Sequence, residues 1–156
     1  MSDQDKPKAR NPGRKVAGLV VGTAAVAAIL LKTMTGQAPL ATGQLVADSR
    51  TTVDIGERGV AVAEPGAELS WSVDRQGSAR VEQLRGDVFY RVDRARSFVV
   101  HTPAGNVAVI GTCFRVAIDQ RDANVVVTVY EGSVLFADKS GGTARVDAGG
   151  SIEVGR

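Results

Sequence analysis

Apolar and polar residues alternate along short stretches of this chain, as in strands that bury one face. The alternation changes phase at one conspicuous place. Val107 and Val109 occupy odd positions, whereas the apolar residues within 114–118 occupy even positions. A chain that exchanges its apolar face over two residues, here Gly111 and Thr112, has to bulge, kink or cross to another layer.

The same period-2 alternation begins at about Leu45 and continues to the C-terminus. Turn residues interrupt it often enough to predict about ten to twelve strands, spaced by about 8–12 residues, and no helical period of useful length follows. We therefore expect an all-β domain over 45–156. The residues alone indicate strands and turns, with a β-sandwich as one possible architecture. The predicted turns lie at 56–59, 65–66, 74–77, 102–105, 131–132 and 138–142.

An uncharged apolar segment, 16–31, precedes this pattern. A buried core helix is disfavoured because the segment is apolar all round. A cleaved signal peptide would use the small residues of 36–38, but Pro39 follows them directly and opposes cleavage. A transmembrane helix over 16–34 is the preferred interpretation, because 16 residues rise about 24 Å and Lys32 can snorkel to the membrane surface.

Basic residues predict the orientation of this helix. The polar segment 1–15 carries five Lys or Arg residues, whereas only Lys32 and Arg50 occur in the twenty residues that follow the apolar segment 16–31. The positive-inside rule places 1–15 in the cytoplasm, as a disordered tail, and everything after the helix outside it. Residues 35–44 are expected to be a linker.

Charge and cysteine content exclude several classes of function. The overall charge is +2, and the first fifteen residues contribute five basic and two acidic side chains, so the remainder carries −1. A near-neutral domain lacks the basic surface of a nucleic-acid binder. The single cysteine excludes an internal disulfide framework, and no Cys/His cluster exists for a metal ion.

Residues suited to catalysis are present only singly. His101 is the only histidine and lies in a strand-like run, so a solvent-facing or hydrogen-bonded role is expected. Cys113 has no evident base nearby in the sequence, and Asp87, Asp93 and Asp119 lack paired spacing. We predict no catalytic, cofactor-binding or metal-binding residues, and therefore a protein that is not an enzyme.

The other distinctive side chains have structural interpretations. Arg91, Arg94 and Arg96 form a small basic spot at a turn, expected to be solvated surface. Trp71, the only tryptophan, is expected in the core. Cys113 should face away from its apolar neighbours in the same strand, as a structural thiol.

Three blocks of sequence carry a resemblance to a known family. The central block, 100–116, reads Val-x-Thr-Pro-x-Gly-x-Val-x-Val-Ile-Gly-Thr-x-Phe-x-Val; the block before it is Leu84–Val92, and the block after it is Val127–Val134. In this order they resemble the FecR domain, the exported sensory module of a family of bacterial transmembrane regulators. The resemblance implies a solenoid-like twisted β domain in the periplasm, attached to the inner membrane.

The resemblance also implies a function. FecR-type regulators couple an envelope signal, often from an outer-membrane transporter, to an extracytoplasmic-function sigma factor, and they act by binding proteins. Strand edges are suited to receive a partner strand. Typical members carry a cytoplasmic helical domain, for which 1–15 is too short, so we expect an accessory role in a sigma/anti-sigma system. The alternative is an envelope scaffold that binds a wall polymer or itself.

Overall fold

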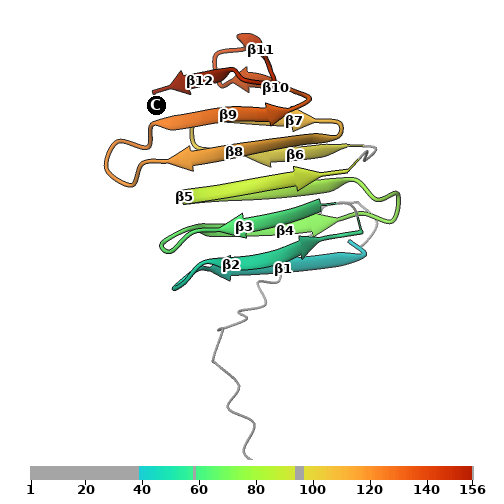
Figure 1. The fold of residues 1–156 in the computed structure, drawn as a ribbon. Coiled ribbons are helices and arrows are strands. Elements are labelled where there is room, and N and C mark those ends of the chain that lie inside the picture. Colours follow the sequence, from blue (N-terminus) through green and yellow to red (C-terminus); the bar gives the residue numbers. More distant parts are fainter. Residues whose placement is uncertain (1–38, 58, 94–96, 156) are drawn as a thin grey trace, which may run out of the picture.

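The computed structural model describes residues 39–57, 59–93 and 97–155, which form twelve strands and their connections without a helix (Figure 1). This confirms the all-β prediction. No helix long and apolar enough to cross a membrane occurs in these ranges. The predicted tail 1–15 and transmembrane helix 16–34 lie outside them. The strands are β1 (Ala41–Val46), β2 (Thr51–Ile55), β3 (Gly59–Ala63), β4 (Glu68–Val73), β5 (Ala79–Val92), β6 (Phe98–His101), β7 (Gly105–Val109), β8 (Thr112–Ile118), β9 (Val125–Glu131), β10 (Ser133–Asp138), β11 (Thr143–Asp147) and β12 (Ser151–Val154).

The strands form two layers joined by the long strand β5. Sheet A has the order β1-β4-β5-β6-β7-β10-β11, and sheet B has the order β2-β3-β5-β8-β9-β12. The pairing is antiparallel throughout, except between β5 and β6. Both layers rise in near chain order from β1 and β2 at one end to β11 and β12 at the other (Figure 1). The two layers together therefore behave as one sheet folded about β5.

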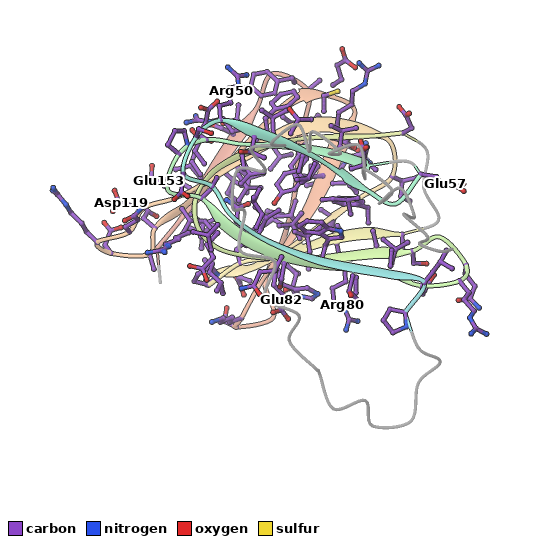
Figure 2. The ribbon with its side chains drawn as sticks, turned by 90° about the horizontal axis from the view of Figure 1, so that it is seen from below. Arg50, Glu57, Arg80, Glu82, Asp119 and Glu153 are labelled. Carbon is purple, nitrogen blue, oxygen red and sulfur yellow. The ribbon has the colours of Figure 1, made fainter. Side chains whose placement is uncertain are left out.

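The core lies between the two layers, where valine side chains from both inner faces meet (Figure 2). Three aromatic rings occupy its centre. Tyr90 stacks on Phe114 with ring centroids 5.1 Å apart, and it forms a T-shaped pair with Phe98 with ring centroids 6.1 Å apart. Charged residues such as Arg80 and Glu82 point away from the core. This inward apolar, outward polar arrangement is the reason for the period-2 pattern of the sequence.

The predicted phase change at Gly111 is a crossing between the layers. Val109 ends β7 in sheet A, and Thr112 begins β8 in sheet B. Gly111 has a φ of 74°, a left-handed conformation that glycine adopts at little cost. Thr112 is buried, and its hydroxyl donates to the Ser133 carbonyl at 3.0 Å. Of the three alternatives for this site, the crossing is therefore correct.

A second phase change, inside β5, was not predicted. Val81 points into the core from the first half of the strand, and Val88 does so from the second half. Leu84 lies at the register shift opposite β4 and is 58% exposed. Gly86 follows with a φ of 83°, and a Cβ there would clash with the Cα atom of Ala67. The bulge and the glycine together let one strand change from sheet A to sheet B.

A buried polar network stabilises this bend. Gln83 is 1% exposed, and its Nε2 donates to the carbonyls of Gly86 and Val116, each at 3.0 Å. The Tyr90 hydroxyl donates to Gln83 Oε1 at 3.0 Å. Burial raises the pKa of Tyr90, so the phenol stays protonated as a donor. One side chain thus bonds both halves of β5 and the neighbouring strand β8.

The N-terminal end of the domain differs from the expected boundary. β1 begins at Ala41, inside the predicted linker 35–44. Gly43 leaves room for the Trp71 ring, because a Cβ at this position would clash with the ring. Trp71 is half-buried and packs against the core, as expected. The layers face each other as in a sandwich, while their near-sequential rise is the feature expected of a solenoid.

Candidate protein-interaction surface

An aromatic pair lies on the outer face of sheet B. Phe89 of β5 and Tyr130 of β9 have ring centroids 5.6 Å apart, and Tyr130 is 50% exposed. Val62 of β3 is the cross-strand partner of Phe89. β8 lies between β5 and β9, so the two rings meet across it on the outer face. Aromatic and branched side chains that gather on one outer sheet face are typical of protein-binding surfaces, where tyrosine and phenylalanine are enriched.

An oriented ion pair borders the aromatic pair. The Arg115 guanidinium donates through Nε to Asp87 Oδ1 at 2.7 Å, and through its Nη2 to Asp87 Oδ2. This double hydrogen bond raises the pKa of Arg115. The side chains remain 42% and 33% exposed, so their net contribution to stability is about 0–1 kcal/mol. The pair instead holds the Arg115 guanidinium in a fixed direction. Arg115 is the cross-strand partner of Phe89, so the guanidinium lies beside the aromatic pair, where a binding partner can reach it.

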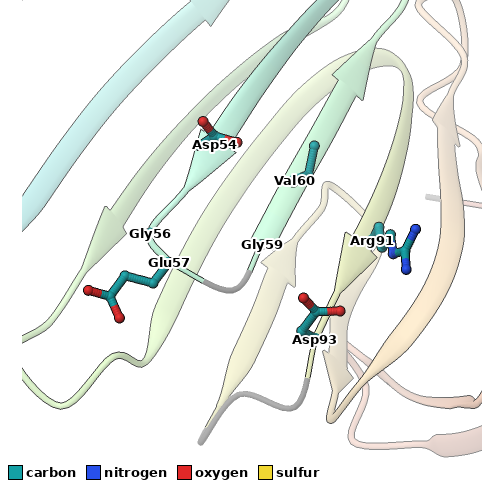
Figure 3. A pocket seen from close by; sticks show the side chains of 7 residues that line it. All are labelled: Asp54, Gly56, Glu57, Gly59, Val60, Arg91 and Asp93. Carbon is teal, nitrogen blue, oxygen red and sulfur yellow. The ribbon is translucent and has the colours of Figure 1, made fainter.

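A depression of about 540 Å³ opens at the end of the same sheet (Figure 3). Asp54 of β2, Glu57 of the β2–β3 turn and Asp93 after β5 supply three carboxylates, and Arg91 supplies one guanidinium. The lining is therefore net acidic. We define the sheet B surface as Val62, Asp87, Phe89, Arg115 and Tyr130 together with this depression.

Cys113 lies on the sheet B side, half-buried, while its neighbours Phe114 and Val116 are fully buried. The predicted outward direction is confirmed. Burial and the nearby Glu131 raise the pKa of the Cys113 thiol. A raised pKa disfavours the thiolate, which is the nucleophilic form, so the environment does not activate this cysteine.

His101 lies on the outer face of sheet A, half-buried, with Nδ1 2.6 Å from Asn106 Oδ1. The predicted hydrogen-bonded role is thus present at Nδ1, while Nε2 has no partner among the described residues. Because His101 and Cys113 lie on the outer faces of different sheets, the core separates them. They cannot form a nucleophile–base pair.

The acidic residues singled out in the sequence have separate roles. Asp87 is in the ion pair with Arg115, Asp93 lines the depression, and Asp119 accepts a hydrogen bond from the Arg121 N–H at 2.7 Å in the β8–β9 turn. Asp87 and Asp119 also line a second, shallow recess near Pro65. No group of three or more potential metal ligands occurs in the part of the chain that the structure describes.

The remaining basic residues are only partly placed. Arg91 lines the acidic depression, and Arg94 and Arg96 lie outside the described residues. The aromatic pair was not predicted, although the alternation pattern in the sequence indicates it. Phe89 and Tyr130 each occupy the outward phase of a strand whose neighbouring positions are buried. An aromatic residue at an outward position marks a candidate contact surface.

Comparison with known proteins gives a consistent family and fold. The FecR family, described as FecR protein, matches residues 43–135. Two crystal structures of a candidate anti-sigma factor from Parabacteroides distasonis have similar folds, with TM-scores of 0.62 and 0.58 and identities of 22% and 21%. Each alignment covers 74% of this chain and 55% of that protein. No curated protein sequence matches significantly.

Proposed function

Because this chain belongs to the FecR family, we propose that it is a membrane-anchored sensor of an envelope signal that acts by binding other proteins. The family and the candidate anti-sigma factors of similar fold support a regulatory, signal-sensing role. The proposal adds a site of action, the periplasmic side of a bacterial inner membrane, and a mode of action, protein contact without catalysis. We also propose that the two layers, whose strands follow one another in near chain order, form a short solenoid.

The observation that carries the binding function is the sheet B surface. Phe89 and Tyr130 place aromatic area in solvent, and the Asp87–Arg115 pair holds a guanidinium at its border. Aromatic and arginine side chains supply most of the energy in protein interfaces. The acidic depression beside them favours a partner with a basic residue at the rim.

The proposed partners follow from the family. They are a membrane regulator, a sigma/anti-sigma system or an outer-membrane transducer. The chain spans 55% of the length of the candidate anti-sigma factors of similar fold. Direct anti-sigma activity therefore is not carried over, and we propose an accessory role beside a second regulator.

The membrane anchor is the second part of the proposal. The uncharged segment 16–31, the basic tail and Lys32 support a single span over 16–34 with the C-terminal domain in the periplasm. A phosphatase fused after Arg156 is expected to be active. An inactive fusion, with the protein present in the membrane, would overturn this topology.

Affinity capture of the tagged full chain from detergent extracts tests the binding function. Recovery of a sigma factor, an anti-sigma protein or a transporter supports a regulator, and recovery of glycan alone supports the alternative, an envelope scaffold. Phe89→Ser and Tyr130→Ser should each abolish recovery. Leu135→Ser is the matched control, because Leu135 is 48% exposed on the outer face of sheet A. Equal loss in the control would place the binding site elsewhere.

A further inference from the structure

The first strand of sheet A is an unusual edge. Within the described residues β1 pairs with β4 alone, and its other side is free. β1 has six residues, Ala-Thr-Gly-Gln-Leu-Val, without a charge or a proline. Natural proteins usually protect an edge of this length with lysine, proline or a bulge, since it otherwise pairs with another strand. The other edge strands each carry charged residues: Asp54 in β2, Arg145 and Asp147 in β11, and Glu153 in β12.

The core is also incompletely covered beside this edge. Leu45 of β1, Val53 of β2 and Trp71 of β4 contact the core but remain partly exposed. In the middle of the domain the equivalent positions are fully buried, as at Val116. Val46, at the end of β1, is 50% exposed on the outer face. Additional structure on the β1 side would bury this apolar surface.

We propose that the free edge of β1 pairs with β1 of a second copy of this chain, antiparallel about a two-fold axis at Gly43. Sheet A would then continue through both copies. A two-fold axis makes the contact isologous, so each copy contributes the same six residues and the assembly closes as a dimer. No pocket or further ligand is involved.

The side chains of β1 are complementary in this register. On the outer face Thr42 lies opposite Gln44 of the second copy, so a hydroxyl meets an amide. On the inner face the small Ala41 lies opposite the larger Leu45. Gly43 lies opposite Gly43 of the second copy at the two-fold axis. In each copy the Trp71 ring lies over the Gly43 of that copy.

The backbone supports the same register. Ala47, just after β1, donates its N–H to the Ala67 carbonyl at 2.9 Å. By the alternation of antiparallel ladders, odd-numbered residues of β1 bond to β4, and the even-numbered Thr42 and Gln44 direct N–H and C=O groups to the free side. Thr42 facing Gln44 of the second copy therefore forms a hydrogen-bonded pair, twice about the axis.

Charge favours a second copy over a charged partner. In a strand pair with two-fold symmetry, each strand lies beside an identical strand. A strand without charged residues therefore brings no like charges together, whatever the register. β12, by contrast, brings Glu153 against Glu153 of its copy when centred on that residue. The absence of charge in β1 also gives no electrostatic preference for a different protein.

Disulfide trapping in membranes tests the proposal with the full chain. In a Cys113→Ser background, the double variant Thr42→Cys and Gln44→Cys should give a covalent dimer on non-reducing gels after mild oxidation. The matched control is Ser151→Cys and Glu153→Cys in β12, which should remain monomeric. Equal trapping at both edges, or trapping at neither, would overturn the proposal.

A substitution tests the dimer without a crosslink. Light scattering of the purified full chain in detergent should give twice the monomer mass after subtraction of the detergent. Gln44→Lys should reduce this to the monomer mass, because lysine is the usual protection of an edge. Ser151→Lys should leave the dimer intact. The far-UV circular dichroism spectrum reports that each variant is folded. A monomeric unsubstituted chain, or a dimer that persists in Gln44→Lys, contradicts the proposed interface.

Discussion

The Gln83–Tyr90 network allows a quantitative test of how β5 holds two sheets together. Tyr90→Phe removes one hydroxyl and leaves the buried Gln83 Oε1 without its donor. An unsatisfied buried acceptor costs about 1–3 kcal/mol, so we expect a loss of about 1.5 kcal/mol in the free energy of unfolding. Gln83→Leu should cost about 3 kcal/mol, because it leaves the Tyr90 hydroxyl and the carbonyls of Gly86 and Val116 without that partner.

The double variant distinguishes a network from independent contacts. With both side chains changed, neither the phenol nor the amide oxygen remains unsatisfied, and only the two carbonyls lose a donor. The expected cost is about 2 kcal/mol, which is about 2.5 kcal/mol less than the sum of the single variants. Carbonyls tolerate a missing donor better than most buried groups, which keeps this cost low.

Trp71 provides the assay, because it is the only tryptophan and packs against the core. Urea unfolding of the full chain in a non-denaturing detergent, followed by its emission, gives the free energy for each variant. If Tyr90→Phe is neutral and the double variant equals the sum of the singles, the hydrogen bonds do not stabilise the bend, and this account of β5 is refuted.

Three further predictions use the same domain. Gly86→Ala should destabilise the fold by about 3 kcal/mol, against about 1 kcal/mol for Gly77→Ala, in urea unfolding; both have positive φ, but only a Cβ at Gly86 would meet the Ala67 backbone. Equal losses would exclude the close approach as a cause. Above pH 10, the ordinary pKa of tyrosine, the unfolded state ionises while buried Tyr90 stays neutral, so stability should fall by up to about 1.4 kcal/mol per pH unit relative to Tyr90→Phe. At pH 7.5 the Cys113 thiol should react with iodoacetamide more slowly in the folded than in the unfolded chain, as measured by mass spectrometry; faster reaction in the folded chain would contradict the raised pKa.

Alternation in the sequence predicted most of the strands because the core is one continuous layer between two sheets. Each inward residue sits two positions from the next, and the predicted turns at 65–66, 74–77 and 138–142 all separate strands. The change of layer after Val109 was visible because the phase shift falls between two complete strands. Three motif blocks were sufficient to identify the family.

The bend within β5 was not visible for a physical reason. Gln83 is two residues after Val81 and points to the same inner face of β5. In the sequence, however, a polar residue at this position suggests that the buried face has ended. The carbonyls of Gly86 and Val116 and the Tyr90 hydroxyl together satisfy its side chain. Val116 is 33 positions away on another strand, so this contact gives no local signal in the sequence. The sheet B surface was missed for a similar reason, because Phe89 and Tyr130 meet only after β5 and β9 are placed.

The sharing of β5 between both sheets has a consequence for how the domain comes together. The strands before it, β1 to β4, belong to two layers that have no common member until residues 79–92 are available. As the chain is synthesised from its N-terminal end, the hairpin of β2 and β3 and its neighbours are therefore expected to dock only after this segment is available. Once β5 is in place, neither layer can detach alone, so the domain is expected to lose its structure in a single cooperative step.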